Sequence, residues 1–85
     1  MMYACVVEDK RTFLRTTFLC GCLDTINALR ELGAAKKSTF RTSAVSECSN
    51  ESAERIRNKR LSNETELIQR VGFELSEYLN WGVAA

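Results

Sequence analysis

Four cysteines are the side chains of this sequence with the most chemistry to offer, and their spacing limits that chemistry. Two of them form the run Cys20-Gly21-Cys22, while Cys5 and Cys48 are isolated in the sequence. Zinc sites are usually built from paired C-x(2–4)-C knuckles, often with histidine, and this sequence has no histidine. We therefore expect four free thiols, no metal and no cofactor. Cys5 and Cys20 are then expected to pack as small apolar side chains.

Catalytic groups are scarce in the sequence. Without histidine, Ser-His-Asp and Cys-His catalysis are excluded, and the commonest general base near neutral pH is missing. The four glycines, Gly21, Gly33, Gly72 and Gly82, lie far apart, so they form no glycine-rich phosphate loop. Paired carboxylates need a sizeable cleft, which a chain of 85 residues seldom provides. We expect a protein that is not an enzyme.

One basic segment indicates DNA recognition rather than catalysis. The run Leu29-Arg30-Glu31-Leu32-Gly33, followed by Ser38-Thr39-Phe40-Arg41, resembles a helix-turn-helix motif. In that motif a first helix ends near a glycine, and a second helix, opening here with Ser-Thr, enters the major groove. Leu29 stands where a small residue usually lets the helices touch, and the connector is one residue longer than usual. The resemblance implies a nucleic-acid-binding surface made of Lys36, Lys37, Ser38, Thr39 and Arg41.

The sequence also has more large aromatic side chains than a small core obviously needs. Phe73 lies about 200° from Val71 around an ideal helix, so it faces away from the core if Val71 faces it. Exposed aromatic side chains often anchor protein contacts, because they bury a large area at a small entropic cost. Alternatively, the hairpin or the helix over residues 50–61 covers this part of the chain. The predicted surface for a protein target or a homodimer consists of Phe73, Tyr78 and Trp81, and its alternative, an open face of the N-terminal hairpin, consists of Tyr3, Phe13 and Phe18.

Two short β-prone segments predict that hairpin. Residues 2–7 are rich in β-formers, and residues 12–19 have threonines spaced among large apolar residues. The polar residues Glu8 to Arg11 lie between the two segments and suit a turn. Phe13 and Phe18 fall on opposite faces of the second strand, so one face of the hairpin could meet a partner.

The middle of the chain predicts a helix followed by an ambiguous segment. Asp24 is a favourable N-cap for a helix to Leu32, and Gly33 is a natural stop. The N-terminus of this helix is expected to favour mildly the thiolate of Cys22 just before it. Residues 34–48 contain a β-prone stretch, which predicts either a third strand or a short helix.

Two helices are predicted in the second half. The first runs from Ser49 or Asn50 to about Leu61, with acidic residues near its start and basic residues near its end, as the helix dipole favours. Asn63 and Glu66 have the spacing of a capping box for the second helix. The apolar residues of this second helix fall on one continuous face. They are Leu67, Ile68, Val71, Leu75, Tyr78 and Leu79.

Two glycines in the last helix carry their own predictions. Gly72 lies inside the helix, where glycine costs about 1 kcal/mol relative to alanine, so close packing against a neighbour is expected there. Gly82 is expected to end the helix.

The totals describe an ordinary small globular chain. It has 85 residues, a formal net charge of +1 and 45% hydrophobic residues, which predicts one domain over residues 1–85 and excludes wholesale disorder. No stretch approaches the ~20 apolar residues of a membrane span. Charged residues at 8–11 interrupt the first apolar run, unlike the pattern of a signal peptide. We expect a cytoplasmic protein without membrane contact.

Together these features predict an α+β fold of order β-β-α-β-α-α, with the hairpin and third strand packed against two or three helices. The function we favour is a non-enzymatic intracellular regulator that binds another protein, of the inhibitor, adaptor or antirepressor type found among small phage and mobile-element proteins. The alternative is a small helix-turn-helix-like DNA-binding transcription regulator, and a weaker one is a structural subunit of a homo-oligomer. The near-neutral charge argues against strong non-specific binding to nucleic acid.

Overall fold

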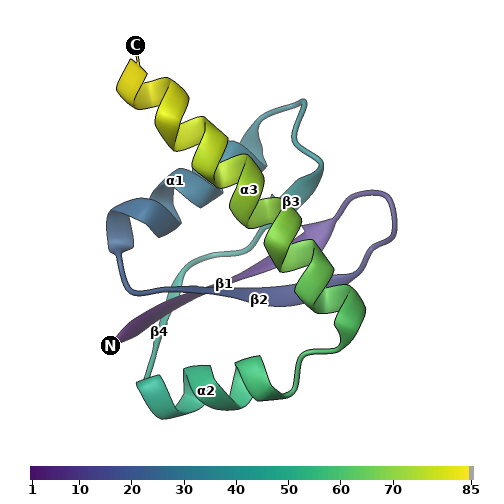
Figure 1. Cartoon of the computed structure of the whole chain (residues 1–85), viewed down its shortest axis with the longest axis vertical. Coiled ribbons are helices and arrows are strands. Elements are labelled where there is room, and N and C mark those ends of the chain that lie inside the picture. The colour runs from purple at the N-terminus through teal and green to yellow at the C-terminus, as the bar shows by residue number, and fades with distance from the viewer. Residues whose placement is uncertain (85) are drawn as a thin grey trace.

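A computed structural model describes the backbone of residues 1–84 and the side chains of residues 1–80. It confirms the α+β fold and the predicted order of elements, with the third strand divided into two short segments (Figure 1). The elements are β1 (Met2–Asp9), β2 (Arg15–Cys20), α1 (Leu23–Ala34), β3 (Phe40–Thr42), β4 (Ser46–Cys48), α2 (Asn50–Asn58) and α3 (Ser62–Ala84). In this part of the chain no helix is long and apolar enough to cross a bilayer.

The sheet is antiparallel, with β1 in its centre. β2 pairs with one side of β1, so that Glu8 lies opposite Arg15 and Tyr3 lies opposite Cys20. β3 and β4 both pair with the other side of β1. The ambiguous segment over residues 34–48 therefore forms strand rather than a short helix.

A β-bulge separates β3 from β4. β3 ends opposite Val7 and β4 begins opposite Ala4, so two residues of β1 face the three residues 43–45. Ser43 fills this irregularity, because its N–H donates to the Val6 carbonyl at 2.9 Å and its hydroxyl accepts from the Val6 N–H at 3.0 Å. Such a bulge twists an edge strand and makes it a poorer template for pairing with another chain.

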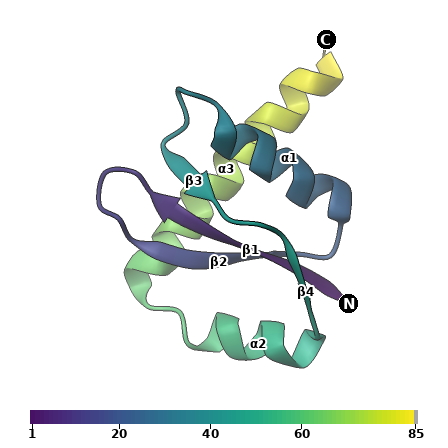
Figure 2. The ribbon, with the colours of Figure 1, turned by 180° about the vertical axis from the view of Figure 1, so that it is seen from behind.

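The core lies between one face of the sheet and the two helices α1 and α3, which cross each other in both views (Figure 1, Figure 2). Successive side chains of a strand alternate between the two faces of a sheet, so Ala4 and Val6 of β1 face the opposite side from the core. These two residues and Ile56 of α2 line one hollow on that side. The sheet therefore has α1 and α3 on one face and α2 on part of the other. The buried core consists of Cys5, Val7, Ile26, Leu29, Phe40, Leu67, Val71 and Leu75.

The hairpin turns later than the sequence predicts. β1 continues to Asp9, two residues beyond the expected end, and β2 begins at Arg15 instead of residue 12. The Asp9 carboxylate accepts hydrogen bonds from the backbone N–H groups of Arg11 and Thr12, which places the reversal after Asp9. Short polar side chains that bind the backbone two residues on are typical of such turns.

The ends of α1 also differ from the prediction. Cys22 is the N-cap residue and makes no side-chain capping bond, while Asp24 lies in the first turn. Gly33 is buried inside the last turn instead of stopping the helix. A Cβ atom on Gly33 would lie 2.7 Å from Cγ2 of Thr42 and 3.3 Å from Cε2 of Phe40. The glycine is therefore required by the close approach of α1 to β3, not by helix termination.

The junction between α2 and α3 corrects three further predictions. α2 ends at Asn58 rather than Leu61, and α3 begins at Ser62. The capping carboxylate of α3 is Glu64, which accepts from the Leu61 N–H at 2.7 Å, so the predicted Asn63–Glu66 pair is displaced by two residues.

Neither glycine of α3 behaves as expected. Apart from its chain neighbours and the backbone of its own helix, no atom lies within 4 Å of the position of a Cβ on Gly72, so the predicted close packing is absent there. The helix continues through residue 82 to Ala84, so Gly82 does not end it.

Candidate binding surfaces

The four cysteines are unpaired and lie in different environments. Cys5 is buried, and burial raises the pKa of its thiol, which donates to the Ser43 carbonyl at 3.2 Å. Cys22 is exposed, and the nearby hydroxyl and backbone N–H of Thr25, at the start of α1, lower the pKa of its thiol. Among the described residues no three side chains of metal-binding type come together.

The β1–β2 loop over residues 10–14 is organised by a buried carboxylate. Asp9 is only 6% exposed. Its Oδ1 accepts from the Arg11 N–H at 2.7 Å and from the Thr12 N–H at 3.3 Å, while its Oδ2 accepts from Nη2 of Arg70 at 2.9 Å. The Arg11 N–H, supported by the Arg70 guanidinium, holds the pKa of Asp9 below its ordinary value. This one side chain therefore connects the loop to α3.

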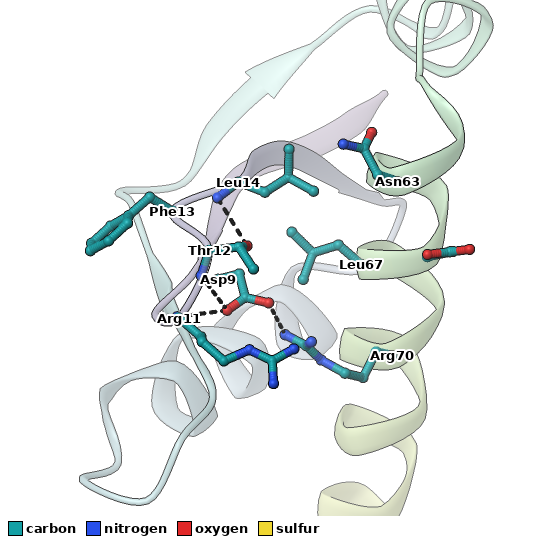
Figure 3. A pocket seen from close by; sticks show the side chains of 9 residues that line it. Asp9, Arg11, Thr12, Phe13, Leu14, Asn63, Leu67 and Arg70 are labelled. Carbon is teal, nitrogen blue, oxygen red and sulfur yellow. Dashed lines mark hydrogen bonds and ion pairs between the residues drawn. The ribbon is translucent and has the colours of Figure 1, made fainter.

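Phe13 is held in the loop with a left-handed backbone. Its φ is 63°, which a residue with a large side chain rarely adopts. Two backbone hydrogen bonds of 2.9 Å fix this conformation, from the Phe13 N–H to the Asp9 carbonyl and from the Asp9 N–H to the Leu14 carbonyl. The ring is 65% exposed and points away from α3 (Figure 3). The chain thus presents a large apolar ring to solvent from a fixed backbone.

A hollow of about 540 Å³ lies between this loop and the first turns of α3. Leu14 and Leu67 contribute apolar walls, and Arg70 reaches across to Asp9 (Figure 3). Asn63 and Glu66 line it from α3. The side chains that line this hollow include no arrangement suited to catalysis by a nucleophile and a base.

The predicted helix-turn-helix is wrong, because its second helix is replaced by a loop and a strand. Residues 35–39 form a loop, and Phe40 begins β3 with its side chain fully buried. The hydroxyl of Ser38 donates to the Phe40 carbonyl, which stabilises the approach to the strand. The residues proposed for DNA contact remain at the surface or close to it: Lys36, Lys37, Thr39 and Arg41 are exposed and Ser38 is half-buried.

The α1–β3 loop lies directly beside the β1–β2 loop. The backbone N–H of Lys10 donates to the Thr39 carbonyl at 3.0 Å, and Asp9 pairs with Phe40 in the sheet. Both loops lie at the same end of the sheet in the two views (Figure 1, Figure 2). The sequence gives no sign of this neighbourhood, since the 20 residues 15–34 separate the two loops.

The aromatic residues of the predicted hairpin face do not share one surface. Tyr3 and Phe18 are partly buried against the core cluster, on the face that α1 and α3 cover. Phe13 lies outside β2, in the loop at the other end of the hairpin. The interpretation that all three line an open face is therefore corrected, and Phe13 alone is exposed.

The second half of α3 exposes several apolar side chains. Phe73 is 65% exposed, so neither the hairpin nor α2 covers it. Tyr78 is 40% exposed, and its hydroxyl donates to Oε2 of Glu31 on α1 at 3.1 Å. Leu79 is 38% exposed. The side chain of Trp81, the third predicted contact residue, lies outside the part of the chain whose side chains the structure describes.

The end of α3 extends past the core that anchors it. Leu75 is the last buried residue among the described side chains, and the helix continues to Ala84. At a rise of 1.5 Å per residue these nine further residues span about 13 Å. We refer to residues 76–84 as the α3 overhang. Tyr78 still contacts α1 through Glu31, and the end of the helix projects beyond α1 in both views (Figure 1, Figure 2).

Comparison with known proteins gives no match, since no family model, no curated protein and no solved structure resembles the chain.

Proposed function

We propose that the protein is a non-catalytic regulator that acts by binding another protein through the α3 overhang. The observation that carries this proposal is the length of α3, which runs nine residues beyond its last buried side chain among those described. Most helical stability in proteins comes from packing of an apolar face, and the described side chains of this segment are exposed. A partner that packs against the overhang accounts for its presence.

The side chains of the overhang indicate the shape of that partner. Tyr78 and Leu79 continue the apolar face of α3 beyond Leu75, and both are more than a third exposed. Carboxylates of Glu31 and Glu74 lie beside this face, and each accepts a hydrogen bond from a neighbouring hydroxyl. An apolar groove with a basic rim is the complementary surface for a helix of this kind.

A capture experiment with matched variants tests the proposal. The immobilised protein is incubated with lysate of cells that express it, and bound proteins are quantified by mass spectrometry. Tyr78→Ser combined with Leu79→Ser is expected to weaken capture of the main partner about tenfold or more, since anchor residues each contribute more than ~1 kcal/mol. Leu61→Ser is the control, because Leu61 is 65% exposed but lies before α3, away from the overhang.

The outcome separates this proposal from its alternatives. A partner that binds the double variant as well as the wild type contradicts a role for the overhang. Light scattering on the pure protein identifies self-association. If the wild type has twice the mass of a monomer and the double variant has a lower mass, the overhang binds a second copy of the protein. That result also contradicts the proposal that the overhang binds a different protein.

A further inference from the structure

Half of the positive charge of the protein gathers at one end of the sheet. The loops over residues 10–14 and 35–39 meet there, through the Lys10 N–H and the Thr39 carbonyl. Six of the 12 lysines and arginines lie on these loops or on the adjoining strand residues. We refer to this surface as the basic end, and it consists of Lys10, Arg11, Arg15, Lys36, Lys37 and Arg41.

Most of this charge is not neutralised locally. Arg15 is paired with Glu8 at 3.2 Å. The other five cations of the basic end have no salt-bridge partner among the described residues. The nearby carboxylate of Asp9 is occupied by Arg70. Glu8, Asp9 and Glu74 also lie at this end, and the Glu74 carboxylate accepts from the Thr39 hydroxyl at 3.2 Å. The six cations outnumber these three carboxylates, so the basic end is positive although the formal charge of the whole chain is only +1.

Phe13 lies on one of the two loops that form this surface. Its loop also carries Lys10 and Arg11, and β2 continues from the loop to Arg15. The ring is 65% exposed, and its backbone is fixed at a φ of 63° by hydrogen bonds to Asp9. A fixed, exposed aromatic ring among cations is the combination that single-stranded nucleic acids require, with bases stacking on the ring and phosphates meeting the cations.

We infer that the basic end binds single-stranded nucleic acid, with one base stacked on Phe13. A single strand fits better than a duplex, because an exposed ring can stack only on an unpaired base, and no described helix at this end is free to enter a major groove. This inference is independent of the overhang, which carries the proposed function.

Fluorescence anisotropy with labelled oligonucleotides tests the inference. The probes are oligothymidylate and oligouridylate of about 20 nucleotides, and a duplex of equal length, at about 50 mM salt. Both single strands are expected to bind more tightly than the duplex. The ratio of the affinities for oligothymidylate and oligouridylate shows whether the protein prefers DNA or RNA.

The aromatic contribution is tested with Phe13→Gly. Glycine tolerates positive φ, so this variant keeps the fold and removes only the ring. Loss of one stacked base is expected to weaken binding about tenfold or more, and Phe13→Trp is expected to retain it. Phe73→Ser is the matched control, because Phe73 is equally exposed but lies on α3.

The cationic contribution is tested by the salt dependence of binding. Lys36→Ser combined with Lys37→Ser is expected to reduce the slope of log K against log salt by about 1.4, at roughly 0.7 per phosphate contact. Arg55→Ser combined with Arg57→Ser removes the same charge from α2 and is expected to leave the slope unchanged.

Three results would overturn the inference. They are no binding of either single strand at about 50 mM salt, equal binding of the duplex, and equal losses in the test and control variants. If Phe13→Gly instead abolishes capture of a protein from lysate and no oligonucleotide binds, the basic end is a protein contact. The overhang variant Tyr78→Ser with Leu79→Ser should bind oligonucleotides as the wild type does. A failure of one proposal can therefore be distinguished from a failure of the other.

Discussion

Asp9 couples the β1–β2 loop to α3 through a single carboxylate. One oxygen holds the backbone of the loop and the other holds Arg70, although the two residues are 61 positions apart. The side chain is buried, so these bonds are screened little by water. The position of Phe13 depends on them, because its own N–H binds the Asp9 carbonyl.

Replacing Asp9 is therefore expected to destabilise the fold in a graded way. Asp9→Asn keeps an acceptor for the loop N–H groups but removes the charge that Arg70 meets. Asp9→Ala removes both and leaves buried donors unsatisfied, which typically costs about 1–3 kcal/mol. Thermal denaturation followed by circular dichroism at neutral pH should rank the wild type above Asp9→Asn and Asp9→Asn above Asp9→Ala.

The pH dependence of this effect has a definite sign. The pKa of Asp9 is lower in the folded protein than its unfolded value of about 3.9, so the ionised carboxylate favours folding. That contribution is complete above about pH 5, begins to decrease near the unfolded pKa, and is lost as the pH falls through the folded pKa. The difference in stability between the wild type and Asp9→Asn should shrink in acid. A difference that grows below pH 4 would show that Asp9 does not act as a carboxylate.

At the scale of helices and strands, two glycines with different surroundings predict opposite effects of the same substitution. A Cβ on Gly33 meets Thr42 and Phe40 between α1 and β3, whereas a Cβ on Gly72 meets nothing within 4 Å apart from its chain neighbours and the backbone of its own helix. Gly33→Ala should destabilise by about 1–3 kcal/mol through overpacking. Gly72→Ala should stabilise α3 by up to about 1 kcal/mol.

Melting temperatures provide the measurement for both variants. For a domain of this size 1 kcal/mol corresponds to a shift of about 4–8 °C. The two changes are expected to have opposite signs. Shifts of the same sign would show that the space around one of the glycines differs from that described here.

The elements themselves were largely predictable, because local patterns encode them. The apolar face of α3 requires only the spacing of Leu67, Val71 and Leu75, and all three are buried. The sequence does not decide between strand and helix over residues 34–48, because a short β-prone run is compatible with both. The pairing of this segment with β1 decides between them, and that pairing is a tertiary contact.

The candidate surfaces were less predictable, because they depend on contacts between distant residues. Lys36 and Arg41 are recognisable as basic from the sequence, but their neighbours Lys10 and Arg11 come from the β1–β2 loop, on the other side of residues 15–34 in the sequence. The left-handed backbone of Phe13 has no local signal, since glycine or asparagine is the usual residue there. The sequence does contain one clue to the turn, which is Asp9, because aspartate side chains often accept a hydrogen bond from the backbone two residues further on.

At the scale of the whole molecule, the two candidate surfaces occupy different parts of the fold. The basic end lies where the β1–β2 and α1–β3 loops meet, and the overhang lies at the far end of α3 (Figure 1). A protein of this design could hold a nucleic acid and a second protein at once. The two proposals therefore describe compatible contacts rather than competing ones.

Assembly also depends on how the open edge of the sheet is protected. β2 is an edge strand among the described elements, because it pairs with β1 alone. The backbone N–H and carbonyl of Val6 both form hydrogen bonds with Ser43. Thr17 lies opposite Val6 in the β1–β2 pair, so its own backbone N–H and carbonyl point away from β1. The guanidinium of Arg60 donates to the Thr17 carbonyl and occupies this edge. Unprotected edges of this kind pair with other chains.

Arg60→Met is accordingly expected to convert the protein into a self-associating one. Methionine retains much of the apolar stem but leaves the Thr17 carbonyl free for another strand. Light scattering, measured well below the melting temperature, should show a mass that rises with protein concentration. Lys59→Met is the matched control, because it removes the same charge from the adjacent exposed residue and should stay like the wild type. Equal association of both variants would assign the effect to lost charge, and no association of either would show that the bulge and α2 already protect the sheet.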